Sequence, residues 1–123
     1  MKSRVKPKWH KNVEQDDFEA AESYLALIYS AKQSARFVAK LRRARPARFK
    51  AKDIFRASQL SKLGVSNLRV VRDRKKIKAG TPLSPILLMR DERNGKVVVA
   101  DGYHRLCAVY EVNEDAWIPC RII

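Results

Sequence analysis

Residues able to do chemistry gather at one place in the sequence, the run Asp101-Gly102-Tyr103-His104-Arg105. The β-branched segment 97–99 before it favours a buried strand, and the apolar residues after it favour a helix over 103–112. The first N–H groups and the positive dipole end of a helix bind anions, and Gly102 lets a ligand approach the backbone. We therefore predict a phosphate site at this turn. The alternative is an ordinary strand–turn–helix connection in which Asp101 caps the helix.

The surrounding pattern predicts the elements that position this turn. Asn94-Gly95 lies between apolar runs at 86–90 and 96–100, which indicates a β-hairpin. We also expect an extended segment over 47–55, a basic helix over 67–79 and a closing strand over 117–122. Residues 16–43 have acids at their start, cations at their end and apolar residues at helical spacing, which predicts one long helix. The residues of that helix expected to face the core are Phe18, Ala21, Leu25, Ile28, Tyr29, Phe37 and Leu41.

These elements predict an α+β fold, a small mixed β-sheet with a hairpin and packed helices, preceded by a long N-terminal helix. Residues 1–12 are expected to form a flexible basic arm, with Trp9 as an anchor. Residues 13–46 form the N-terminal helix packed on the domain, and residues 47–123 form the domain itself. Residues 63–66 are similar to the turn of a helix-turn-helix motif. However, Leu60 occupies a position where that motif prefers a small residue, so the motif is not favoured.

The distribution of charge points to a polyanionic partner. The chain has a formal net charge of +14. Residues 1–78 carry 22 of the 27 Lys and Arg and 7 of the 13 Asp and Glu, a balance of +15, whereas residues 79–123 have a balance of −1. Nucleic acid is the first expectation and an anionic membrane the second. A soluble protein with a solvated basic face remains the alternative.

Several other classes of protein are not indicated. No segment has the roughly 18 consecutive apolar residues of a membrane span, and the N-terminus lacks the apolar core of a signal peptide. Cys107 and Cys120 lie in apolar patterns typical of core thiols, and two His without a Cys-x-x-Cys motif predict no metal site. The expected compartment is the cytoplasm.

The C-terminal two thirds of the chain, residues 47–123, resembles the ParB N-terminal/sulfiredoxin-like superfamily. The residues that carry the resemblance are Pro85-Ile86 in the first strand, the turn Asp101–Arg105 opening a helix, and Ile118-Pro119 in the closing strand. In that superfamily the turn binds nucleotide phosphates: CTP in chromosome-partition proteins, ATP in sulfiredoxins, and ADP or ATP in free-serine kinases. The resemblance therefore implies ATP, ADP or CTP as the ligand here, with Mg²⁺ as an accompanying ion, and leaves open which.

The departures from the superfamily restrict what the resemblance implies. Sulfiredoxins have a catalytic Cys where this chain has Tyr103, so sulfinic-acid reduction is not expected. Partition proteins continue into a helix-turn-helix domain, whereas this sequence ends at Ile123, so operator recognition is not expected either. Free-serine kinases have the turn most similar to this one together with an upstream carboxylate base, for which Asp53 is a weak candidate.

Three functions follow from these observations. The first is a binding module that holds nucleotide or nucleic-acid phosphate at the turn and contacts a nucleic-acid backbone with its basic helix and arm. The second is a small nucleotide-dependent phosphotransferase resembling free-serine kinases, and the third is a structural or interaction protein whose site has decayed. The expected catalytic residues are Asp101 and His104. The expected phosphate-binding residues are Ser84, Gly102, Tyr103, His104 and Arg105, and the expected nucleic-acid contacts are Arg69, Arg72, Lys75, Lys76 and Lys78.

Overall fold

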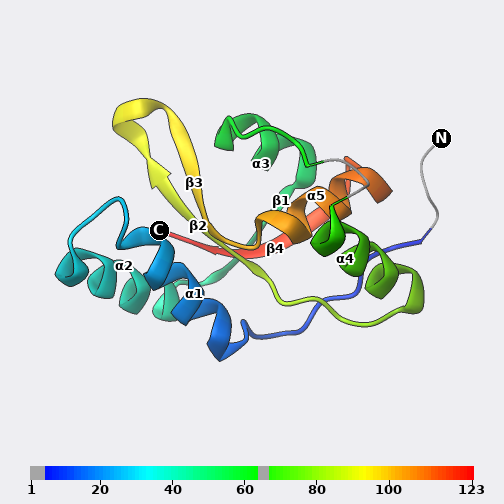
Figure 1. Ribbon diagram of the computed structural model, residues 1–123, viewed down its shortest axis with the longest axis horizontal. Coiled ribbons are helices and arrows are strands. Elements are labelled where there is room, and N and C mark those ends of the chain that lie inside the picture. Colours follow the sequence, from blue (N-terminus) through cyan, green and yellow to red (C-terminus); the bar gives the residue numbers. More distant parts are fainter. Residues whose placement is uncertain (1–4, 64–66) are drawn as a thin grey trace.

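The computed structural model describes residues 5–63 and 67–123 (Figure 1). It confirms the α+β class, with five helices and a mixed four-stranded sheet among the described residues. The elements in chain order are α1 (Gln15–Leu25), α2 (Ala31–Arg43), β1 (Pro46–Lys50), α3 (Ala51–Ser58), α4 (Leu68–Ala79), β2 (Ile86–Asp91), the 3₁₀ turn η1 (Glu92–Asn94), β3 (Lys96–Asp101), α5 (Tyr103–Val112) and β4 (Trp117–Ile122).

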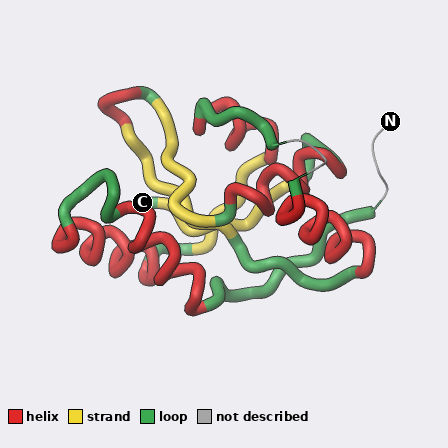
Figure 2. The backbone as a smooth tube through the Cα atoms, viewed as in Figure 1, coloured by secondary structure: helices red, strands yellow, loops and turns green. Residues whose placement is uncertain are grey.

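The sheet has the order β1-β4-β2-β3 and separates two layers of helices (Figures 1 and 2). The hairpin β2–β3 and the pair β1–β4 are antiparallel, while β2 and β4 run parallel. Along β2, Ile86 and Leu88 belong to the core cluster that contains residues of α3, α4 and α5, whereas Leu87 and Met89 belong to the cluster of α1 and α2. Because both faces of β2 are covered, it is apolar at successive positions rather than alternate ones.

The predicted single helix over 16–43 is wrong. The structure has two antiparallel helices, α1 and α2, separated by a turn in which Leu27 is 85% exposed and Ile28 is 52% exposed. A straight helix of that length would extend about 40 Å, well beyond the sheet it has to cover. Folding back lets Phe18, Ala21 and Leu25 of α1 and Val38 and Leu41 of α2 bury against the same sheet face.

The second helix of this pair begins at a well-formed cap that the sequence analysis did not use. The Ser30 hydroxyl accepts a hydrogen bond from the Gln33 amide at 3.1 Å. Such a cap satisfies an amide that would otherwise lack a partner at the helix start.

The predicted extended segment over 47–55 is correct only in its first part. Residues 46–50 form β1, but the chain then enters α3, whose Ala51 and Ile54 are fully or almost fully buried. Gln59 has a left-handed backbone that ends α3. The helix-turn-helix turn considered at 63–66 lies largely outside the described residues.

The basic helix, the hairpin and the last two elements agree with the sequence analysis. Asn67 caps α4 through its side-chain oxygen, which accepts from the amides of Arg69 and Val70, and Gly80 ends the helix with positive φ. The bounds of α5 and β4 are those predicted. None of the described helices has the length and apolar character needed to cross a bilayer.

Residues 8–10 of the basic arm predicted over 1–12 are ordered against the protein, and the prediction that Trp9 anchors the arm is confirmed. Trp9 packs against the core, His10 N donates to Leu83 O at 2.8 Å, and Leu83 N donates to Lys8 O at 2.8 Å. Residues 1–4 of the predicted arm lie outside the described residues. The segment leading into α1 is therefore fixed beside the loop that precedes β2.

We predict that Ser30→Ala lowers the free energy of unfolding by about 1 kcal/mol, because it removes the cap of α2. If the chain formed one helix through this point, the same change would stabilise it, since Ala has the highest helix propensity. Urea unfolding measures the difference. Ser23→Ala, an exposed change within α1, is the matched control and should leave stability unchanged or slightly higher.

Candidate functional site

The predicted strand–turn–helix is formed by β3, Gly102 and α5. Gly102 has φ +108° and occupies the position before the helix, where its carbonyl accepts from Leu106 N at 2.9 Å. Because glycine has no side chain, it cannot cap the amides of the first turn of α5, in contrast to Ser30 and Asn67 at their helices. The geometry leaves the positive end of α5 without a side-chain cap from this position.

Packing and backbone conformation both require glycine at position 102. A Cβ atom at this position would lie 2.3 Å from Ile86 Cγ2 and 2.9 Å from Arg105 Nη2. The neighbours that exclude a side chain here are Ile86 of the buried strand β2 and the guanidinium of Arg105. A larger residue would push β2 and the guanidinium apart.

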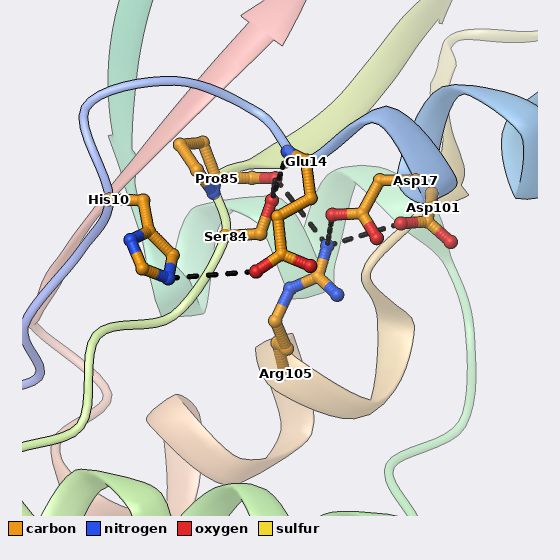
Figure 3. A network of polar contacts seen from close by, with 7 residues as sticks. All are labelled: His10, Glu14, Asp17, Ser84, Pro85, Asp101 and Arg105. Carbon is orange, nitrogen blue, oxygen red and sulfur yellow. Dashed lines mark hydrogen bonds and ion pairs between the residues drawn. The ribbon is translucent and has the colours of Figure 1, made fainter.

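Arg105 points into the protein toward two carboxylates and a carbonyl (Figure 3). Its Nη2 donates to Asp17 Oδ2 at 3.2 Å, to Asp101 Oδ2 at 3.2 Å and to Pro85 O at 3.4 Å. Its side chain is only 17% exposed. The guanidinium expected to bind phosphate is thus already neutralised, and it links α1, β3, α5 and the loop before β2.

One atom of Arg105 has no such partner. Arg105 Nε is buried, and among the described residues no acceptor lies within hydrogen-bonding distance of it. A buried N–H without an acceptor costs free energy, so such groups in native proteins usually have a protein, water or ligand partner.

Burial and neighbouring charges shift the pKa values of the carboxyl groups around this guanidinium. Burial raises the pKa of Asp101 from 3.8 to about 6; the charge of Arg105 opposes this shift and the neighbouring Asp17 carboxylate adds to it. Burial also raises the pKa of Asp73, against the attraction of Arg105 and Lys76. Each of these acids therefore holds its proton more readily in the folded protein than in water.

The fold joins the two sets of residues predicted separately on α4 and α5. A polar cleft of about 250 Å³ lies between the helices, lined by Arg69, Arg72, Asp73, Lys76, Asp101, Gly102, His104 and Arg105. The three cations of α4 are three and four positions apart, which places them on one face of the helix. We call this hollow the α4–α5 cleft.

The imidazole of His104 belongs to this cleft. Partial burial, followed by the charge of Arg69, lowers the pKa of His104 below its ordinary 6.5, although Asp73 acts in the opposite direction. His104 is therefore mainly neutral at pH 7, and it gains charge only in acid or when an anion is bound beside it.

Other residues that the sequence predicted as site residues do not line the α4–α5 cleft. Lys75 and Lys78 are exposed on other faces of α4, and Tyr103 does not line the hollow. Ser84 is buried, and its Oγ accepts from Glu14 N at 3.1 Å at the start of α1 (Figure 3). Asp53 lines a different, mainly apolar hollow beside the hairpin, so it is not near His104.

Sequence reasoning missed two acids of the site. Asp17 was attributed to the helix dipole, and nothing local indicates a partner 88 positions away. Asp73 had a usable signal: it is the one acid in the basic segment 67–79, and it shares the buried face of α4 with Val70 and Ile77.

Within residues 5–63 and 67–123, no three His, Cys, Asp or Glu side chains are grouped so as to hold a metal ion. Comparison of the chain with models of protein families, with curated proteins and with solved structures found no match.

We predict that the free energy of unfolding of Asp101→Asn, measured relative to wild type, increases as pH rises. Between about pH 4 and 6 the folded wild type holds the Asp101 proton that the unfolded chain has lost, so its stability falls through this window. The variant lacks this titration, whereas both proteins retain that of Asp73. Urea unfolding at pH 4.5 and 7.5 should show the variant's relative stability increasing by at most about 2 kcal/mol, because part of the titration is already complete at pH 4.5.

Asp16→Asn, which removes an exposed acid next to Asp17, is the control for this measurement. A stability difference between Asp101→Asn and wild type that is the same at both pH values would contradict a raised pKa for Asp101.

We predict that Gly102→Ala is more destabilising than Gly95→Ala. Both glycines have positive φ, which costs an Ala about 1–3 kcal/mol, but a Cβ at Gly95 would have no atom within 4 Å. At Gly102 the overlap with Ile86 adds to the conformational cost. Thermal or urea unfolding of both variants measures this, and equal losses would show that the contact with β2 is not limiting.

Proposed function

We propose that the protein binds the phosphate backbone of nucleic acid in the α4–α5 cleft. The observation that carries this proposal is that Arg69, Arg72 and Lys76 line the same hollow as the uncapped first turn of α5. Cations supply the attraction for phosphate, and the helix amides supply directed hydrogen-bond donors.

The dimensions of the cleft favour a polymer over a complete nucleotide. Residues 69 to 76 span about 10 Å along the helix axis, more than one phosphate requires. The hollow measures about 250 Å³, and its lining side chains are all charged or polar apart from Gly102. Sites for drug-sized ligands are usually larger, about 300–1,000 Å³, and mainly apolar. The net charge of +14 supports the same conclusion.

A nucleotide-dependent phosphotransferase is a second candidate. It is favoured by the carboxyl of Asp101, whose pKa of about 6 lies near the value that suits a general base at neutral pH. His104 lines the same cleft and would stabilise transferred charge when protonated. The proposed relation of residues 47–123 to the ParB N-terminal/sulfiredoxin-like superfamily would provide ATP, ADP or CTP as the ligand. Cytoplasm is the proposed location under either function.

We predict that the protein binds a 20-base-pair duplex with little sequence preference and with an affinity that falls steeply as salt rises. Arg69→Ala and Arg72→Ala should each lower the log–log salt slope by about one unit, because each arginine neutralises about one phosphate. Fluorescence anisotropy of two unrelated duplexes at several salt concentrations measures both properties. ATP, ADP and CTP are titrated in parallel.

Arg93→Ala, which removes an exposed cation at the tip of the hairpin, is the matched control and should leave the slope nearly unchanged. If Arg93→Ala and Arg72→Ala have equal effects, the attraction comes from net charge and not from the cleft. Binding and turnover of ATP that Asp101→Asn abolishes, without duplex binding, would favour the phosphotransferase. Absence of binding to every ligand would leave the structural or interaction protein.

A further inference from the structure

A second basic surface lies on the other face of the sheet, where β1 pairs with the start of β4. Phe49 and Ile118, which are register partners, pack into the core cluster of α3, α4 and α5. Because side chains alternate along a strand, Arg48, Lys50 and Trp117 project from the opposite face. Trp117 is 48% exposed there.

The indole of Trp117 contacts two cations. Arg48 Cζ lies 4.6 Å from the centre of the ring, and Lys50 Nζ lies 5.3 Å from it. Lys50 is the direct register partner of Trp117, and Arg48 is the diagonal one, so the arrangement is set by the sheet. Trp117 thus presents an aromatic surface beside two cations, and Trp and Arg are enriched at interfaces.

The chain leading into and along β1 carries cations only, while the acids Glu114 and Asp115 lie just before Trp117. Every charged residue between Glu22 and Asp53 is a Lys or Arg, and Arg42, Arg43 and Arg45 are exposed between the end of α2 and the start of β1. Asp115, two positions before Trp117, is paired with Lys52 Nζ at 2.9 Å. The α4–α5 cleft uses none of these cations, since it lies among the helices that cover the other face of the sheet.

We propose that Trp117, Arg48 and Lys50 form a binding platform for single-stranded nucleic acid. A base stacks on the indole in place of a cation that lies over the ring, and the displaced cation contacts a flanking phosphate. A duplex does not use this platform, because its bases are already stacked on one another. This inference goes beyond the cleft, because it adds a surface that responds to single strands only.

The first test follows the emission of Trp117 alone. Trp9→Phe removes the other tryptophan and keeps an aromatic residue against the core. Saturating oligo(dT)₁₅ should quench the remaining emission, whereas the same concentration of a 15-base-pair duplex should leave it nearly unchanged. Vesicles of phosphatidylserine and phosphatidylcholine test whether a membrane surface, the other partner of basic aromatic patches, is what this platform recognises.

The second test uses variants of the platform. Trp117→Leu should weaken oligo(dT)₁₅ affinity roughly 5- to 150-fold, the range for losing one stacked base, and Trp117→Phe should restore part of it. Duplex affinity should change less than twofold in both variants. Tyr24→Leu, which replaces another exposed aromatic residue on α1, is the matched control. Circular dichroism and thermal unfolding confirm that each variant is folded.

Three outcomes would contradict the proposal that Trp117, Arg48 and Lys50 bind single strands. One is unchanged Trp117 emission with bound oligo(dT)₁₅, and another is an equal loss of single-strand and duplex affinity in Trp117→Leu. The third is a blue shift of emission with anionic vesicles together with no response to the oligonucleotide. Failure of the cleft is recognised separately, because Arg72→Ala then leaves duplex binding unchanged while Trp117→Leu still lowers single-strand binding.

Discussion

The buried ion pairs of Arg105 are the interaction on which the arrangement of this protein depends. One guanidinium nitrogen contacts the carboxylates of Asp17 and Asp101 and the carbonyl of Pro85, and so joins α1 to β3 and to the first turn of α5. All three charged side chains are less than one fifth exposed. Removing one member of a buried pair typically costs 3–5 kcal/mol, so the turn is held in one geometry by its charges as well as by its packing.

Because Arg105 is paired, the two helices of the α4–α5 cleft differ in what they present: α5 presents backbone amides and α4 presents cations. Because Asp17 and Asp101 already neutralise Arg105, the first turn of α5 offers amide groups more than net charge. The positive charge of the cleft comes mainly from Arg69, Arg72 and Lys76 of α4, a helix that Asn67 caps. A phosphate in the cleft would therefore be oriented by one helix and attracted by the other.

The sheet keeps the two basic surfaces apart. Its central strand β2 is buried on both faces, whereas β1 lies at an edge, where α1 and α2 leave the outward side chains of Arg48 and Lys50 beside Trp117. A protein with basic surfaces on both sides of one small sheet can contact a polyanion at two separate places. The salt dependence of binding then reflects the total number of phosphates that both surfaces neutralise.

The sequence by itself determined the local elements: the strand, turn and helix over residues 96–112, the hairpin and the basic helix, because β-branched runs, glycines and caps act within a few residues. It also indicated the cations of the cleft. Only the tertiary structure decided that Arg105 pairs with Asp17, that Gly102 is required by Ile86, and that residues 16–43 fold back as two helices. Those outcomes depend on which surfaces meet across the sheet: the periodicity of a segment indicates which of its faces is buried but not which distant segment packs against that face.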